Sequence, residues 1–270
     1  MNKNLIIHPK FDSLRKELEE LRRKSSQLYL KAEYMQFEER PLLYSLYETT
    51  IGQLEYESFV LNVRIRLLEL EISLRQSYIN RNETVNEYAV SEKIEFAQQK
   101  YKIEIDQKEA EIKAAQDYLK SPAMSVEESN EIRELYRMIA KTLHPDLNPN
   151  VSQKEKDLFL KAIAAYRIGD IHVLRQVALA ISEEKIEDIP EDNLPTLIES
   201  ARKSIREFEK RIEAMEREFP FIYRNQLKDE NWIKEQKVEI SEHISAAKAK
   251  IEKLTNYLTI LKLWKKESLS

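Results

Sequence analysis

The sequence predicts an all-α, elongated protein in which long antiparallel helical hairpins or coiled coils flank a small hairpin of two shorter helices. Apolar residues recur at spacings of three, four and seven along most of the 270 residues. The chain has only 2 Gly, and 34% of its residues are charged, which favours long helices and few loops. No segment shows the alternation of apolar and polar residues between Gly or Asn turns that is typical of strands.

Residues 1–121 are predicted to form an N-terminal helical, coiled-coil region. Pro41 is expected to break or kink its first helix, because proline cannot donate the helical hydrogen bond. A second long helix, over residues 42–80, carries two apolar rows, so we expect it to be buried by more than one neighbour. The Asn80-Arg81-Asn82 tripeptide predicts a turn, and a third helix should then fold back on the second as an antiparallel hairpin.

The tripeptide His144-Pro145-Asp146 separates the next two predicted helices. Pro145 cannot lie inside a helix and disfavours helical backbone at the residue before it, so one helix should end near Leu143. Ser152 has a glutamate three residues later, the spacing of a capping box, so a second helix should begin there. We expect a helical hairpin whose loop holds His144 and Asp146 in water.

Both helices of this hairpin are amphipathic, so their apolar faces should pack together. The predicted contacts are Leu135, Tyr136, Ile139 and Leu143 on the first helix, and Phe159, Ala162, Ala165 and Tyr166 on the second. Arg133, Arg137 and Lys141 recur every four residues on another face of the first helix. They could be only a solvated row, but their position beside the loop favours a role in binding.

The segment resembles the J-domain, the module of DnaJ-type co-chaperones. The family's second helix ends in a pattern close to Y-R-x-x-A-x-x-x-H-P-D-x-N. The matching residues are Tyr136, Arg137, Ala140, His144, Pro145, Asp146 and Asn148, and Phe159 and Ala165-Tyr166 match the family's third helix. The module is assigned to residues 122–182. It has no clear counterpart of the family's short first helix, whose place the end of the preceding long helix could take, and it has Leu147 where a basic residue is common.

The resemblance implies a function in which this chain is not itself an enzyme. The J-like hairpin would dock on a DnaK-type chaperone and stimulate its ATPase, and the partner would bind the ATP, so no cofactor is expected here. The implied partner-binding residues are His144, Pro145, Asp146, Arg133, Arg137, Lys141 and Asn148. The coiled-coil segments would bind a client protein, choose the location, or join two copies of the chain.

The end of the chain is predicted to return to long helices. Residues 183–196 are an acidic connector with two prolines, and residues 197–270 show heptad spacing on both sides of Phe219-Pro220-Phe221. We therefore expect residues 197–270 to form a C-terminal helical hairpin.

Composition excludes several other classes of protein. There is no Cys and there are only four His, which do not fall at metal-ligand spacing, so no metal site is expected. The net charge of −4 argues against bulk nucleic-acid binding. No apolar run is long enough to span a membrane or resembles a signal peptide, so we expect a cytoplasmic protein.

A hypothesis of a different class stays open. The chain could be a structural or assembly protein, in which the long helices oligomerise and the J-like hairpin is a fold without a chaperone partner. The absent first helix and Leu147 favour this alternative.

Overall fold

The computed structural model describes residues 9–121, 124–146, 148, 151–182 and 193–267. Across these residues the regular structure is entirely helical, which confirms the all-α prediction. The chain divides into two compact units, and each combines segments that are far apart in the sequence. Unit 1 comprises residues 1–41 and 122–221, and unit 2 comprises residues 42–121 and 222–270.

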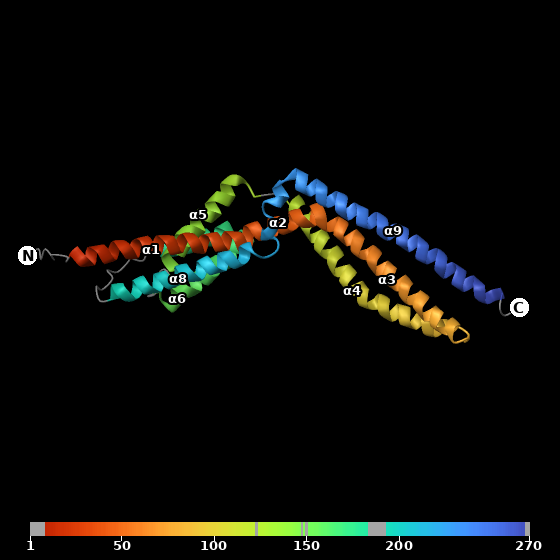
Figure 1. Cartoon of the computed structure of the whole chain (residues 1–270). Helices are drawn as coiled ribbons and strands as arrows, with labels where there is room; N and C mark the ends of the chain where they lie inside the picture. Colours follow the sequence, from red (N-terminus) through yellow and green to blue (C-terminus); the bar gives the residue numbers. More distant parts are fainter. Residues whose placement is uncertain (1–8, 122–123, 147, 149–150, 183–192, 268–270) are drawn as a thin grey trace, which may run out of the picture. The chain divides into compact units, whose positions relative to one another are not determined.

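The described residues of unit 1 form five α-helices. Two long ones, α1 (Pro9–Tyr34) and α8 (Leu194–Glu216), lie side by side (Figure 1). Three shorter ones, α5 (Val126–Leu143), α6 (Gln153–Ile168) and α7 (Ile171–Ser182), each pack against the other two. Helix α1 also contacts α5, so the J-like segment is held within a larger helical unit.

The ends of the short helices are set by local sequence. Ser125 and Ser152 each accept a hydrogen bond from the backbone N–H three residues later, and the glutamate at that position bonds back, so both helices begin with a capping box. The prediction for Ser152 is therefore confirmed. Helix α6 ends at Gly169, whose φ of 72° is in the left-handed region, where a side chain would be strained.

The core of unit 1 contains the contacts predicted for the hairpin. Phe159, Ala162 and Ala165 of α6 are buried, and Leu135 and Tyr166 pack at the edge. The α5 residues buried with them are Ile132, Tyr136, Ile139, Ala140 and Leu143. Tyr29 from α1 and Phe208 from α8 also lie in this core, although the sequence did not connect either residue to the hairpin.

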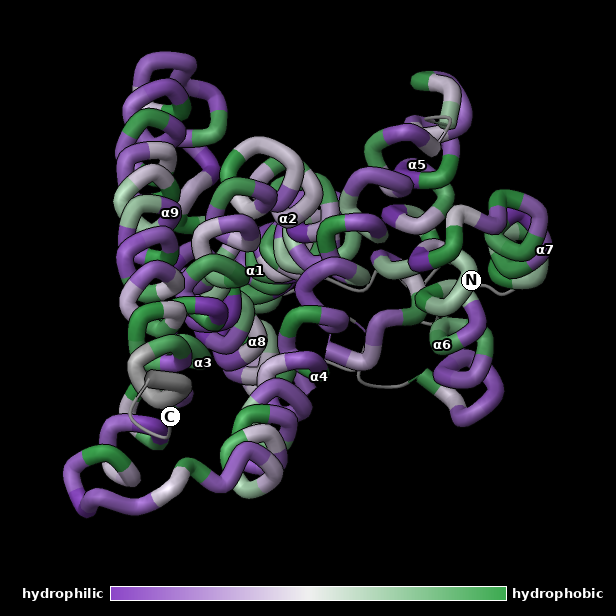
Figure 2. The backbone as a smooth tube through the Cα atoms, turned by 90° about the vertical axis from the view of Figure 1, so that its right-hand side faces the viewer, coloured by the Kyte–Doolittle hydropathy of each residue, from purple (hydrophilic) through white to green (hydrophobic). Residues whose placement is uncertain are grey.

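Unit 2 is organised around α3 (Gln53–Asn80). This helix packs against α4 (Glu87–Lys120) and against α9 (Glu230–Glu267), and lies between them in Figure 1. The two apolar rows predicted on residues 42–80 thus have two neighbours. The turn between α3 and α4 contains Asn82 at φ 57°, a conformation that Asn tolerates. Figure 2 shows the mixture of hydrophobic and hydrophilic residues along each helix.

The predicted hairpin of residues 197–270 is replaced by two separate pairings. Helix α8 packs on α1, where Leu18 contacts an apolar cluster of Leu194, Leu197, Ile198 and Ala201. Helix α9 packs on α3, where Ile65 contacts Ala247 and Ile251. Heptad spacing shows that a helix has an apolar seam but does not identify the partner, so adjacency in sequence was a poor guide here. The predicted acidic connector lies largely outside the described residues.

Of the break or kink predicted at Pro41, the break is wrong, since the chain remains helical there. Helix α1 passes directly into a π-helical turn, η1 (Met35–Glu39), and then into α2 (Arg40–Tyr47). A second π turn, η2 (Glu48–Gly52), joins α2 to α3. Proline lacks an N–H and crowds the carbonyl four residues earlier, and a wider π turn at that point relieves both problems.

Candidate partner-binding site

His144 is buried, which contradicts the expectation that it lies in water. Its exposed fraction is 8%. The imidazole lies 4.2 Å from the ring of Tyr29, 5.2 Å from Phe159 and 6.0 Å from Phe208, measured between ring centroids. The residue stands at the end of α5, as predicted, but α1 and α8 cover it.

The environment of His144 favours the neutral imidazole. Burial lowers the pKa of His144 below its usual value, and the opposing effect of Asp146 is smaller. The backbone N–H of Asp146 donates a hydrogen bond of 3.1 Å to Nδ1 of the imidazole. That nitrogen is thus an acceptor, and the ring fixes the first turn of the loop.

The rest of the loop closes the end of α5. Asn148 donates hydrogen bonds from its side chain to the backbone oxygens of Lys141, at 2.9 Å, and Thr142, at 2.6 Å. These oxygens are among those that a helix end leaves without a partner, so Asn148 acts as a C-terminal cap. Pro145 and Asp146 are half-buried. Leu147, named as a departure from the J-domain pattern, lies outside the described residues.

Helix α1 covers the α5–α6 hairpin through aromatic contacts. The hydroxyls of Tyr29 and Tyr136 are 2.6 Å apart and share a hydrogen bond. The ring of Tyr136 stacks on that of Tyr166 at 4.1 Å, and the Tyr166 hydroxyl donates to Glu38. The sequence left open whether the preceding long helix would replace the missing first helix of the J-domain. Within unit 1, α7 packs on both helices of this hairpin and α1 contacts α5.

The predicted basic row is present on α5, but its three residues differ in whether they form an ion pair. Arg133 is paired with Glu38, to which its Nε donates at 3.0 Å, and its guanidinium lies 5.6 Å from the ring centre of Tyr34. Arg137 and Lys141 are exposed, and neither side chain has a hydrogen bond or ion pair with a described residue. All three predicted cations are therefore exposed, but only Arg133 is ion-paired with a described residue.

A groove of about 1250 Å³ runs between α1 and α5. Its cations are Arg22, Arg23 and Lys31 from α1 and Arg133, Arg137 and Lys141 from α5, and its carboxylate is Glu19. Tyr34, Asn148 and Thr142 add polar groups, and Leu30 and Met138 add apolar surface. The α1 residues were missed by the sequence analysis, because they are more than a hundred positions from the motif and carry no signature of their own.

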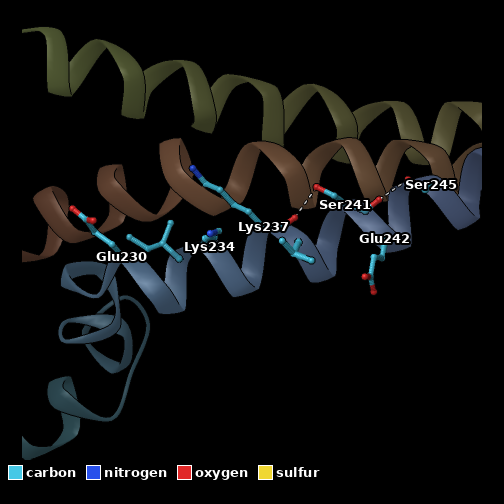
Figure 3. Close-up of a pocket in the computed structure, with 8 residues that line it drawn as sticks. Glu230, Lys234, Lys237, Ser241, Glu242 and Ser245 are labelled. Carbon is cyan, nitrogen blue, oxygen red and sulfur yellow. Dashed lines mark hydrogen bonds between the residues drawn. The ribbon is translucent and has the colours of Figure 1, made fainter.

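A second hollow follows one face of α9 in unit 2 (Figure 3). All eight residues that line it come from this single helix. Ser241 and Ser245 each donate a hydrogen bond to the backbone oxygen four residues earlier, at 2.6 and 2.8 Å. The hydroxyls are therefore used within the helix, and no second element supplies groups that converge on the hollow.

Within the described part of the chain, no group of three His, Cys, Asp or Glu side chains could hold a metal ion. Among the same residues, no helix is both long and apolar enough to cross a membrane. Comparisons of the chain with protein-family models, curated proteins and solved structures found no match.

Proposed function

We propose that this chain is a DnaJ-like co-chaperone that docks on a DnaK-type chaperone and stimulates its ATPase. The observation that carries the proposal is the arrangement of α5, α6 and α7 in unit 1. These helices pack together, and the His144-Pro145-Asp146 turn stands at the end of α5 beside two accessible cations, Arg137 and Lys141. The nucleotide would belong to the partner, and this chain would supply contacts only.

The residues have different proposed roles in docking. Arg137 and Lys141 would attract an acidic surface of the chaperone, which makes association dependent on salt. Asp146 would make the directional contact, because it is half-buried at the turn and close to the accessible row. His144 would act as a positioning residue, since its ring is covered and its Nδ1 holds the backbone of Asp146.

The test is a single-turnover ATPase assay on the chaperone with the full-length protein. Asp146→Asn should abolish stimulation while leaving the melting temperature close to wild type. Arg137→Glu should weaken stimulation, and added salt should do the same to wild type. Lys161→Glu, a matched charge reversal on an exposed position of α6 away from the groove, should have no effect. Equal stimulation by wild type and Asp146→Asn would refute the role given to the turn.

A structural or assembly role is the second candidate, and specific contacts favour it. His144 packs against Tyr29 and Phe208, and Arg133 is paired with Glu38, so part of the motif serves internal packing. On this reading the tripeptide stabilises unit 1 and has no chaperone partner. Absence of stimulation by wild type over a wide concentration range would favour this candidate.

A further inference from the structure

The two sides of α1 differ in how their charges are balanced. Toward α8, the charged residues form ion pairs between the two helices. These pairs are Lys24–Glu209 at 2.8 Å, Lys31–Glu216 at 3.2 Å, Glu17–Arg202 at 2.5 Å and Glu33–Arg211 at 3.1 Å. Toward α5, cations of α1 line the same groove as cations of α5.

The contacts of α1 with the hairpin show how α1 runs relative to α5. Arg133, near the middle of α5, lies over Tyr34, whereas Tyr29 contacts His144 at the C-terminal end of α5. The two helices therefore run antiparallel. Arg22 precedes Tyr29 by two helical turns, so it lies toward the loop end of the groove, where Arg137 and Lys141 are the accessible cations of α5.

Among the cations of the groove that form no ion pair with a described residue, Arg22 is the least exposed. Burial lowers the pKa of Arg22, and its guanidinium has neither an ion pair nor a hydrogen bond with any part of the chain that the structure describes. The side chains of Arg23, Arg137 and Lys141 likewise have no ion pair or hydrogen bond with a described residue. Like charges that face one another repel, and partial burial strengthens that repulsion. An anion bound in the groove would offset this repulsion.

The size and lining of the groove indicate what kind of anion fits. At about 1250 Å³ it is larger than the sites usual for small molecules, which suits an extended segment rather than one anionic group. Its lining combines arginines, which bind carboxylates through two hydrogen bonds, with the apolar side chains of Leu30 and Met138. This pattern matches a peptide in which acidic and apolar residues are mixed.

From these observations, we propose that the α1–α5 groove binds an acidic, partly apolar peptide segment of another protein, with Arg22 and Arg23 of α1 as one wall and Arg137 and Lys141 of α5 as the other. The proposal goes beyond co-chaperone docking, because α1 lies outside the J-like segment and the site needs no chaperone. It assigns a binding role to two arginines that the motif does not include.

The test uses fluorescence anisotropy with the full-length protein and a labelled peptide of alternating Glu and Leu. The peptide should bind, added salt should weaken it, and a peptide with Lys in place of Glu should not bind. Arg22→Gln and Arg137→Gln should each weaken binding by about fivefold or more, since each removes a charge-assisted contact. Circular dichroism and thermal melting would show that these variants remain folded.

Lys24→Gln is the matched control, because it removes the same charge from the same helix on the side that faces α8. It should leave peptide binding within about twofold of wild type. A loss in Lys24→Gln equal to that in Arg22→Gln would overturn the proposal, since net charge and not the groove would then govern binding. Tighter binding of a single-stranded oligothymidylate with the same number of charges would overturn the assignment to a peptide, as would no binding of the Glu–Leu peptide.

Discussion

Unit 1 and unit 2 hold their helices together in different ways. In unit 2, α3 and α9 meet along a regular apolar seam, flanked by the ion pairs Lys248–Glu57, Lys250–Glu69 and Lys262–Glu71, each at 2.8 Å. In unit 1, α1 and α8 meet along a similar seam, but unit 1 also has an aromatic centre to which α1, α5, α6 and α8 each contribute a ring. A periodic seam distributes stability over many similar contacts, whereas an aromatic centre concentrates it in a few residues.

The largest effect is expected for Phe159→Ala in the aromatic centre of unit 1. The ring is only 5% exposed, so its removal should lower the free energy of unfolding by about 3–5 kcal/mol. Urea titrations followed by circular dichroism would measure the change. Leu160→Ala is the matched control, because that side chain is 63% exposed and should change stability by less than about 0.5 kcal/mol. A loss below about 1 kcal/mol for Phe159→Ala would show that the centre is not where stability is concentrated.

His144→Gln should also destabilise unit 1, by about 2–3 kcal/mol. The substitution removes an aromatic ring from contact with Tyr29 and Phe208 and places an amide in that buried site. A His144 side chain in water, as the sequence predicted, would instead leave the melting temperature nearly unchanged on substitution. Thermal and urea unfolding of the same variant distinguish the two expectations, and an unchanged midpoint would contradict the packing described above.

A smaller loss, of about 1–2 kcal/mol, is expected for Arg75→Gln in unit 2. Both Nη atoms of Arg75 donate to Glu87 at 2.8 Å, and its Nε donates to Glu71 at 2.9 Å. The guanidinium is largely buried, but Glu87 is exposed, which limits the effect. Arg81→Gln, which removes an exposed pair with Glu83, serves as the control and should be nearly neutral in the same urea titration. Equal losses in the two variants would mean that burial of Arg75 adds nothing.

The smallest expected effect is the change in the free energy of unfolding with pH. Because burial lowers the pKa of His144, the unfolded chain takes up its proton more readily than the folded protein. The contribution of His144 to stability is fully present above about pH 6.5 and is lost as pH falls toward the lowered pKa, by at most about 1.4 kcal/mol per pH unit. Glu33, whose pKa is raised mainly by burial, has the opposite pH dependence.

Urea titrations of wild type and His144→Gln, at about pH 7 and about pH 5.5, isolate this contribution, since the difference between the two proteins removes terms common to both. The stability of wild type should fall more on acidification than that of the variant. Identical pH dependence would mean that His144 titrates normally and is exposed to solvent.

Much of the fold follows from local sequence, whereas much of the candidate site does not. The capping serine at Ser152 and the packing of α5 on α6 depend on residues a few turns apart, so spacing was sufficient to predict them. The burial of His144 depends on Tyr29 and Phe208, which reach it from helices remote in the sequence. Hydropathy spacing identifies which face of a helix is buried, but a loop residue such as His144 has no face and therefore gave no signal.

The discontinuous composition of unit 1 has a consequence for the order of folding. Its two parts are separated by about 80 residues of unit 2, and bringing the ends of such a loop together has an entropic cost that rises with loop length. Helix α4 returns along α3, and near its end Glu111 accepts a hydrogen bond from Tyr44 at 3.2 Å, so the inserted segment closes on its own beginning. A hairpin of neighbouring helices forms through contacts of low sequence separation and thus rapidly. If the α3–α4 hairpin forms first, it shortens the effective loop that must close for Tyr29 to reach His144. Synthesis from the N-terminus favours this order, because α3 and α4 emerge before α5.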